Sequence, residues 1–155
     1  MSWFLHCLRY YARFKGRASR PEFWWFWGIA TFVNIVLYFI GSQFFLSLVG
    51  VVLKCVWALV TTIPFLAVTS RRLHDSGHSF WWAGAFYVGI AILMFAGLLI
   101  RWLPLSPPQG NVPALLFGLY LLAWFGLFIR LFYLLFVSGE PGGNRYGDPA
   151  PTLPT

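Results

Sequence analysis

Charged side chains are scarce in this chain of 155 residues, where they make up 10% of the composition. Soluble domains carry about 25% charged residues, because charges are needed to cover a surface that faces water. Hydrophobic residues make up 59% of the chain, and only four residues are acidic. These proportions exclude an ordinary water-soluble globule and indicate a small membrane protein of one domain.

Cysteine is equally scarce, which limits the covalent and metal chemistry open to the chain. The two cysteines, Cys7 and Cys55, lie far apart and form no CxxC pair. Neither a disulfide framework nor a zinc site is expected, and the sequence predicts no metal and no cofactor. The net charge of +7 is explained by orientation in a membrane, because basic residues gather on the cytoplasmic side. We therefore expect no nucleic-acid partner.

Long apolar runs are what the sequence has in abundance. A membrane-spanning helix needs roughly 20 mostly apolar residues, and four segments qualify. They cover about residues 23–39, 51–68, 80–103 and 112–137. We predict an all-α integral membrane protein with a single four-helix domain over residues 1–149, followed by a disordered tail over residues 150–155.

Basic residues are distributed unevenly between the two sides of this predicted bundle. The termini and the joint between the second and third segments hold eight of them: Arg9, Arg13, Lys15, Arg17, Arg20, Arg71, Arg72 and Arg145. The other side holds Lys54 and Arg101. Because positive residues are retained in the cytoplasm, both termini and the RRLHD stretch are predicted to be cytoplasmic.

The N-terminal stretch WFLHCLRYYARFK has the pattern of a helix with one aromatic face. At about 100° per residue, Trp3, Cys7, Tyr10 and Phe14 fall on the same side. Such a helix either lies along the membrane surface or packs on the bundle as an ordinary cytoplasmic segment. The sequence favours neither alternative.

A helix cap is predicted where GRASRPEFWWF opens the first apolar run. Ser19 and Glu22 have the spacing of a capping box, and Pro21 is tolerated in a first helical turn. Glu22 therefore has a sufficient structural reason to be present. An ion pair or a ligand is the alternative role for its carboxylate.

The stretch RRLHDSGHSFWW is expected to form a membrane-surface loop between the second and third segments. Arg71 and Arg72 suit the cytoplasmic end of a helix, and Asp75 beside them is expected to be ionised and paired. His74 is a candidate proton carrier or ligand, which makes His74 and Asp75 weak candidates for catalysis. Two histidines without a third ligand give little support to a metal site.

The fourth apolar run carries one arginine and a stripe of small residues. Arg130 lies about 10 Å from the predicted cytoplasmic end, so it must pair or reach back to the surface. Asp75, Glu22 and Glu140 are its candidate partners. Small residues line this run and the third run: Ala114, Gly118, Gly126, Ala85 and Gly89. They let helices approach closely, either within one bundle or at the seam of a homo-oligomer.

Three stretches taken together resemble one known family: FKGRASRPEFWWF, PFLAVTSRRLHDSGHSFWW and GEPGGNRYGDP. In this order they are similar to the bacterial inner-membrane family called domain of unknown function 805, and the likeness covers nearly the whole chain. The resemblance implies a small multi-span protein of the bacterial cytoplasmic membrane and no established reaction. The positions that match the family motif are Gly16, Arg17, Arg20, Glu22, Arg71, Arg72, His74, Asp75, Asn144, Tyr146 and Gly147.

All three motifs lie on the predicted cytoplasmic side, so we expect them to meet in one polar patch. Its predicted members are Arg17, Arg20, Glu22, Arg71, Arg72, His74, Asp75, Arg130, Asn144, Arg145 and Tyr146. The first hypothesis is a non-enzymatic binding or assembly component, whose patch holds an anionic lipid headgroup or a partner's acidic segment. One alternative is a small oligomeric transporter or channel. The other is an enzyme that acts on lipid headgroups through Arg71, His74 and Asp75. Membrane lipids are the expected partners in each case.

Overall fold

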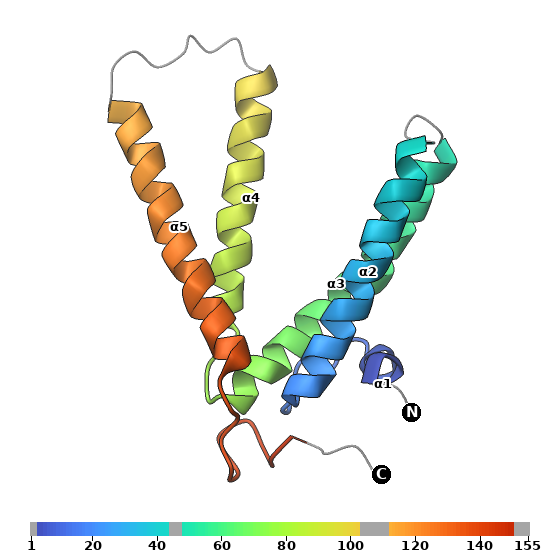
Figure 1. Cartoon of the computed structure of the whole chain (residues 1–155). Helices are drawn as coiled ribbons and strands as arrows, with labels where there is room; N and C mark the ends of the chain where they lie inside the picture. Colours follow the sequence, from blue (N-terminus) through green and yellow to red (C-terminus); the bar gives the residue numbers. More distant parts are fainter. Residues whose placement is uncertain (1–2, 44–47, 103–111, 151–155) are drawn as a thin grey trace. The chain divides into compact units, whose positions relative to one another are not determined.

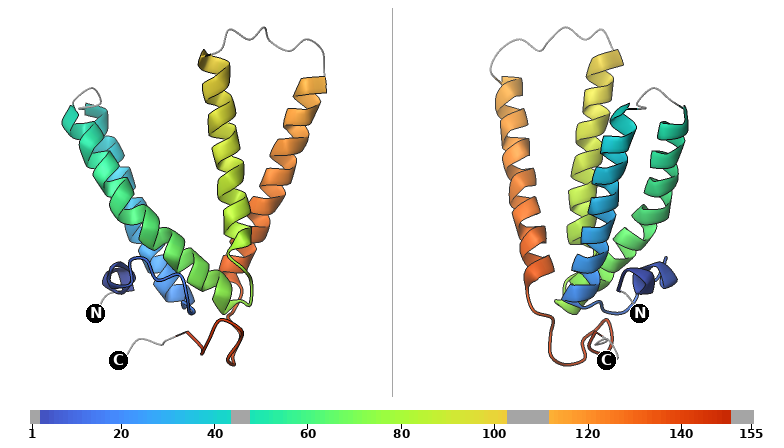
Figure 2. Two further views of the ribbon diagram at one scale, coloured as in Figure 1. Left: turned by 180° about the vertical axis from the view of Figure 1, so that it is seen from behind. Right: turned by 45° about the vertical axis from the view of Figure 1, so that its right-hand side comes forward.

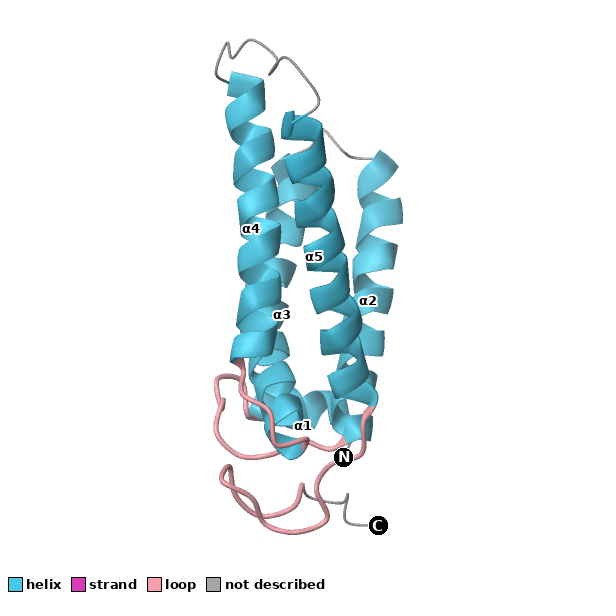
Figure 3. Ribbon diagram, turned by 90° about the vertical axis from the view of Figure 1, so that its left-hand side faces the viewer, coloured by secondary structure: helices cyan, strands magenta, loops and turns pink. Residues whose placement is uncertain are grey.

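The computed structural model describes residues 3–43, 48–102 and 112–150, and the chain divides into two compact units. Within these residues it forms five helices and no strand (Figure 1, Figure 3). The helices are α1 (Trp3–Arg9), α2 (Arg20–Gln43), α3 (Leu48–Asp75), α4 (Trp81–Trp102) and α5 (Val112–Phe136). The first unit comprises Met1–His78 and Ser138–Thr155, and the second comprises Ser79–Val137. The predicted disordered tail falls outside the described residues from residue 151 onward.

Four of the described helices are long and apolar enough to cross a membrane. The candidate spans are Arg20–Phe39, Val49–Asp75, Trp81–Leu98 and Leu115–Phe136. Large hydrophobic side chains are exposed along them, including Leu59 at 71% and Met94 at 72%. An apolar surface of this extent is stable in lipid and not in water. The predicted all-α protein with four apolar spanning helices is confirmed.

α2 begins at the predicted helix cap. The hydroxyl of Ser19 accepts a hydrogen bond from the backbone N–H of Glu22 at 3.4 Å. Ser19 therefore satisfies one of the N–H groups that a first helical turn leaves without an intrahelical partner. α2 and α3 run antiparallel side by side, so the start of α2 and the end of α3 lie at the same end of the pair (Figure 1).

α3 contains a proline and bends along its length (Figure 2). Pro64 lacks a backbone N–H and its ring crowds the preceding turn, which kinks a helix. One turn earlier, the carbonyl of Leu59 accepts a hydrogen bond from the hydroxyl of Tyr11 at 2.8 Å. This bond ties the loop after α1 to α3.

The end of α3 corrects the expectation of a loop over residues 69–79. Helix continues through Asp75, and the non-helical joint is confined to residues 76–80. Gly77 ends the helix with a φ of 73°. Its N–H donates to the carbonyl of His74 at 3.1 Å, and the N–H of His78 donates to the carbonyl of Leu73 at 2.9 Å. This is a Schellman motif, in which a left-handed residue satisfies the last carbonyls of the helix.

α1 is shorter than the helix predicted over residues 3–15, because it ends at Arg9 and residues 10–12 form a turn. Cys7 is fully buried, and Phe4 stacks on Phe26 of α2 with ring centroids 5.2 Å apart. The structure shows this helix packed on α2, and its place along a membrane surface stays a prediction. Beyond it, the chain is held by α3, since the hydroxyl of Ser70 donates to the carbonyl of Phe14 at 3.3 Å.

In the second unit, α4 and α5 form an antiparallel pair with an aromatic contact. Phe86 of α4 stacks on Trp124 of α5 with ring centroids 5.0 Å apart. Gly89 allows this approach, because a Cβ at that position would lie 2.5 Å from the Trp124 ring. Gly89 therefore serves the packing of α4 on α5 within one chain.

Candidate polar binding site

Three segments of the first unit meet beside the end of α3: the loop before α2, the last turn of α3, and the C-terminal segment 138–150. The N–H of Ala18 donates to the carbonyl of Arg71 at 3.0 Å, and the N–H of Glu140 donates to the carbonyl of Asp75 at 2.9 Å. The three motif stretches are thereby joined through their backbones. We call the buried charged residues at this junction the polar cluster: Arg17, Glu22, Arg71, Arg72 and Asp75.

Asp75 is the centre of one half of the polar cluster. Its Oδ1 lies 2.8 Å from Nε of Arg17, and its Oδ2 lies 2.5 Å from Nη1 of Arg72. Arg72 is fully buried, and Arg17 and Asp75 are each 5% exposed. A buried charge is tolerated only when it is paired and hydrogen-bonded. Arg17 and Arg72 are therefore committed to Asp75 and are not free to bind an external anion.

Arg17 also fixes the C-terminal segment. Its Nη1 donates to the carbonyl of Gly142 at 2.5 Å, and its Nη2 donates to the carbonyl of Glu140. Gly139 lies so close to Asp75 that a Cβ at this position would collide with the carboxylate. One arginine and one glycine thus hold the end of the chain against α3.

Glu22 and Arg71 form the other half of the polar cluster. Nη1 of Arg71 lies 2.6 Å from Oε1 of Glu22, which is fully buried. The thiol of Cys7 donates to the same oxygen at 3.6 Å. Burial, together with the nearby Glu22 carboxylate, raises the pKa of the Cys7 thiol from 9.0 to about 12. Cys7 therefore stays protonated and unreactive at neutral pH.

One edge of the Arg71 guanidinium has no hydrogen-bond partner among the described residues. Its Nε and Nη2 are buried without an acceptor, and Oε2 of Glu22 is buried without a donor. Buried polar groups in folded proteins are nearly always satisfied, because an unmade hydrogen bond costs about 1–3 kcal/mol and more for a charged group. This edge therefore carries two donors that no acceptor among the described residues satisfies.

His74 holds the C-terminal segment from the other side. Its ring stacks on that of Tyr146, with centroids 3.8 Å apart and planes within 5°. Its Nδ1 lies 3.2 Å from the carbonyl of Gly16, and its own carbonyl accepts a hydrogen bond from Nδ2 of Asn144 at 2.9 Å. Arg145 donates to a carbonyl of the turn after α3 at 3.0 Å. These four predicted site residues therefore have contacts that position the segment.

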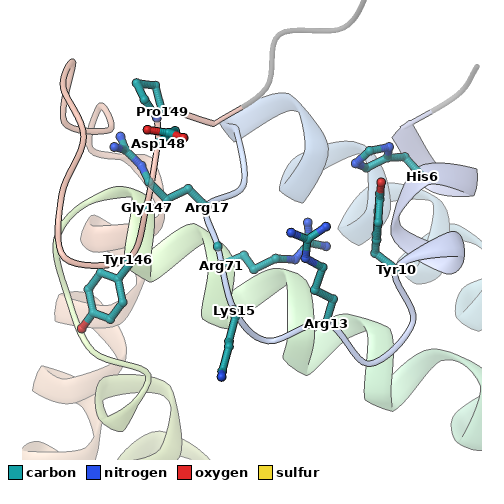
Figure 4. Close-up of a pocket in the computed structure, with 11 residues that line it drawn as sticks. His6, Tyr10, Arg13, Lys15, Arg17, Arg71, Tyr146, Gly147, Asp148 and Pro149 are labelled. Atoms are coloured by element: carbon teal, nitrogen blue, oxygen red, sulfur yellow. The ribbon is translucent and has the colours of Figure 1, made fainter.

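A cavity of about 550 Å³ lies beside Arg71 in the first unit (Figure 4). We call it the basic cavity, and its lining residues are His6, Tyr10, Arg13, Lys15, Gly16, Arg17, Arg71, Tyr146, Gly147, Asp148 and Pro149. Four of them are cationic, and Asp148 is acidic. Figure 4 shows Arg13 and Arg71 extending toward each other from the loop after α1 and from α3.

Five of the predicted patch residues belong to neither the polar cluster nor the lining of the basic cavity. Three of them, His74, Asn144 and Arg145, hold the C-terminal segment, and the other two are Arg20 and Arg130. Arg20 is exposed at the start of α2 and lines a second hollow of the first unit. Arg130 belongs to the second unit, where its guanidinium carbon lies 5.5 Å from the ring centroid of Trp82 and 5.9 Å from that of Tyr133. The pairing of Arg130 with an acidic residue stays a prediction.

The two catalytic candidates have separate partners in the structure. Nδ1 of His74 faces the carbonyl of Gly16, whereas the carboxylate of Asp75 binds two arginines. Over the part of the chain that the structure describes, no group of three His, Cys, Asp or Glu residues is placed to hold a metal ion. The arrangement is suited to binding and positioning.

The predicted patch contained three of the eleven residues that line the cavity, Arg17, Arg71 and Tyr146. The titratable or cationic side chains that it missed include His6, Tyr10, Arg13 and Lys15. Arg13 and Lys15 were considered only for the orientation of the chain. One available signal was that Lys15 stands directly before Gly16 and Arg17 in the first motif stretch. For His6 and Tyr10 the pattern gave no signal, because only the turn after α1 brings them to the cavity.

The helices and the junction define a class: an α-helical, multi-span membrane protein with a buried ionic cluster at one end of its first two spans. The family described as "Protein of unknown function (DUF805)" matches residues 11–148, and the chain belongs to this family. The resemblance drawn from the three motif stretches is confirmed.

Two relatives agree with this assignment. Inner membrane protein YhaI of Escherichia coli (strain K12) is 40% identical over 88 residues, which are 57% of this chain and 73% of the relative. Inner membrane protein YhaH of the same strain is 33% identical over 90 residues, 57% of this chain and 74% of the relative. No solved structure matches. The chain is an integral, multi-pass protein of the bacterial inner membrane, as predicted.

Proposed function

We propose that this inner-membrane protein is a non-enzymatic binding or assembly component, whose basic cavity takes an anionic headgroup or an acidic segment of a partner. The observation that carries the proposal is the buried edge of Arg71, whose Nε and Nη2 have no acceptor among the described residues. The excess of cationic over acidic residues in the cavity lining supports an anionic ligand. In the predicted topology, the cavity faces the cytoplasm.

The fixed state of the polar cluster supports binding over catalysis. A general acid or base must be free to exchange a proton with its substrate. Asp75 instead lies between Arg17 and Arg72, at 2.8 Å and 2.5 Å, and His74 is stacked against Tyr146. Both side chains are therefore engaged in contacts within the protein, and neither belongs to the lining of the basic cavity.

The polar side chains within the described spans support binding over transport. The hydroxyls of Thr61 and Thr62 donate to carbonyls one turn earlier in α3, at 2.8 Å and 2.6 Å. The side-chain amide of Asn34 does the same in α2 at 2.8 Å. Because these donors are already hydrogen-bonded within their own helix, they are less available to a polar solute that crosses the membrane.

Native mass spectrometry of the detergent-extracted protein, combined with affinity purification, tests the proposal. We expect the wild type to retain an anionic lipid or a defined partner protein, and Arg71→Lys to retain less of it. Arg9→Gln serves as the control, because Arg9 is an exposed cation outside the cavity lining. Solute flux through the reconstituted protein, or turnover of a phospholipid, would contradict the proposal.

A further inference from the structure

We infer that the basic cavity is a site for an anionic phosphate group, bound by the free edge of Arg71. The inference rests on the proposed function and names the ligand of the same site. It follows from three observations: the fork of donors on Arg71, two further unpaired cations on the same cavity, and the place of the cavity at the end of two spans.

The free edge of Arg71 is a two-pronged donor. Nη1 is engaged by Glu22 at 2.6 Å, which leaves Nε and Nη2 on the adjacent edge of the planar group. Two such N–H groups point in nearly parallel directions and can bind two oxygens of one phosphate. Because Glu22 and the surrounding protein already hold the guanidinium in place, binding costs little side-chain entropy.

Arg13 and Lys15 supply the charge that Arg71 alone does not. Both are exposed, both line the basic cavity, and neither takes part in a salt bridge within the described residues. The guanidinium carbon of Arg13 is held 5.2 Å from the ring centroid of Tyr10. Arg17 and Arg71 already have carboxylate partners. Asp148, the acidic residue of the lining, is therefore left to balance Arg13 and Lys15. The remaining positive charge favours a phosphate-bearing headgroup with a net negative charge over a zwitterionic one, whose own cation would be repelled.

The cavity lies at the end of two candidate spans, where lipid phosphates are expected. Arg71 belongs to the last turns of the candidate span Val49–Asp75, and the neighbouring span begins at Arg20. Basic groups at this level of a membrane bind anionic headgroups. The same chemistry is also offered by a free phosphate in the aqueous phase. The experiment must therefore separate a lipid source from a soluble one.

Lipid binding is measured first, on the full chain in micelles that contain equal amounts of phosphatidylglycerol and phosphatidylcholine. We expect native mass spectra in which phosphatidylglycerol is retained about tenfold over phosphatidylcholine. Arg71→Lys keeps a cation next to Glu22 but removes the fork, and should reduce this preference to about twofold or less. The double variant Arg13→Gln/Lys15→Gln, which changes two exposed residues, should reduce it similarly without affecting the fold.

Soluble phosphate is tested in a second arm, by calorimetric titration of inorganic phosphate into the same protein in a neutral detergent. A preference for phosphatidylglycerol without saturable phosphate binding assigns the site to a lipid. Saturable phosphate binding without a lipid preference assigns it to a soluble phosphate, and both together support a site that accepts either. If the wild type shows neither a preference for phosphatidylglycerol nor saturable phosphate binding, the inference is overturned.

The matched control removes the same charge from outside the cavity. Arg9 is exposed and does not line it, so Arg9→Gln should leave the preference within about twofold of the wild type, whereas the single variant Arg13→Gln should lower it. An equal loss in this control would mean that general surface charge attracts the lipid, which also overturns the inference. If a partner protein co-purifies with the wild type while both phosphate arms fail, the proposed function stands and the phosphate site falls.

Discussion

Asp75 is the residue on which this half of the polar cluster depends, because its one carboxylate pairs with two buried guanidinium groups. Asp75→Asn keeps the size of the side chain and removes the charge, leaving Arg17 and Arg72 buried without a counter-charge. Breaking a buried ion pair from one side costs about 3–5 kcal/mol. We expect a loss of this order in the free energy of unfolding, measured by denaturant titration in micelles.

Glu140→Gln is the matched control for this prediction. Glu140 is exposed, and no salt bridge of its carboxylate occurs among the described residues, although its backbone carbonyl accepts from Arg17. The substitution removes the same charge from a neighbouring segment and should change the stability by less than about 0.5 kcal/mol. Equal effects of the two variants would show that Asp75 acts through net charge and not through its two contacts.

The raised pKa of the Cys7 thiol predicts that the folded protein loses stability at alkaline pH. The pKa of its thiol is 9.0 in the unfolded reference and about 12 in the folded protein. Between these values the unfolded chain has lost the proton that the folded chain keeps, so stability must fall as the pH rises. The slope is at most about 1.4 kcal/mol per pH unit. Unfolding at pH 8 and at pH 10 should show a larger loss for the wild type than for Cys7→Ser, whose hydroxyl does not titrate in this range.

At the scale of elements, the C-terminal segment 138–150 forms no helix or strand and is held in place by its contacts with the rest of the first unit. Tyr146 stacks on His74, and Tyr146→Ala removes this contact. We expect faster amide exchange over residues 142–148, measured by hydrogen–deuterium exchange and mass spectrometry. Tyr146→Phe keeps the stacked ring and should exchange as the wild type does. Equal exchange in Tyr146→Ala and the wild type would mean that Arg17 alone holds the segment.

The packing of α4 on α5 predicts a steric effect at one glycine. A Cβ at Gly89 would lie 2.5 Å from the Trp124 ring, while the hydroxyl of Tyr120 donates to the Gly89 carbonyl at 2.6 Å. Gly89→Ala should therefore lower stability by about 1–3 kcal/mol through overpacking. Gly97→Ala is the control on the same helix, because a Cβ at Gly97 meets nothing within 4 Å. Thermal unfolding of both variants in the same detergent tests the difference.

The elements could be predicted from the sequence to the extent that hydrophobicity defines them. The four apolar runs predicted the spans, because a helix satisfies all of its backbone hydrogen bonds within its own segment in a lipid bilayer. The end of α3 could not be read in this way. Arg71, Arg72 and Asp75 resemble a surface loop in sequence, but in the structure their side chains are paired, and the helix can therefore continue to the glycine that stops it.

The candidate site was predictable in its membership more than in its pairing. The motif stretches identified the residues of the polar cluster. Their partners come from distant positions, as with Arg17 and Asp75, which are 58 residues apart. Sequence spacing carries no information on such contacts once the chain has turned at Gly16 and Gly77. The unpaired edge of Arg71 is equally invisible in the sequence, because it depends on which atoms Glu22 leaves free.

For the whole molecule, orientation in the membrane is the property that the charge pattern predicts and a reporter can measure. Retention of basic residues on the cytoplasmic side predicts that both termini lie in the cytoplasm. A green fluorescent protein fused after Ala150 should fluoresce, and alkaline phosphatase at the same site should be inactive. Fusions after Trp102, at the end of α4, should give the opposite result. Active phosphatase after Ala150 would place the basic cavity in the periplasm and remove the argument for cytoplasmic ligands.

Self-association is the remaining property of the whole molecule, and the structure divides the predicted small-residue seam into two parts. The space beside Gly89 is occupied by side chains of α5 of the same chain, whereas a Cβ at Gly118 or Gly126 would meet no atom within 4 Å. Ala85 is exposed, and the side chain of Ala114 lies outside the described residues. A homo-oligomer built on this stripe would therefore use α5, where open glycines allow a second helix to approach.

Leucine at the two open glycines tests this seam. We expect Gly118→Leu/Gly126→Leu to convert an oligomer to monomers in native mass spectra, because the added side chains separate the backbones of the two α5 helices. Gly97→Leu adds the same bulk to an open position on α4 and should leave the oligomer intact. A wild type that is monomeric in several mild detergents, or an oligomer that survives the double substitution, would leave α5 facing lipid along this stripe. The basic cavity would then act within a single chain, since all of its lining residues belong to the first unit.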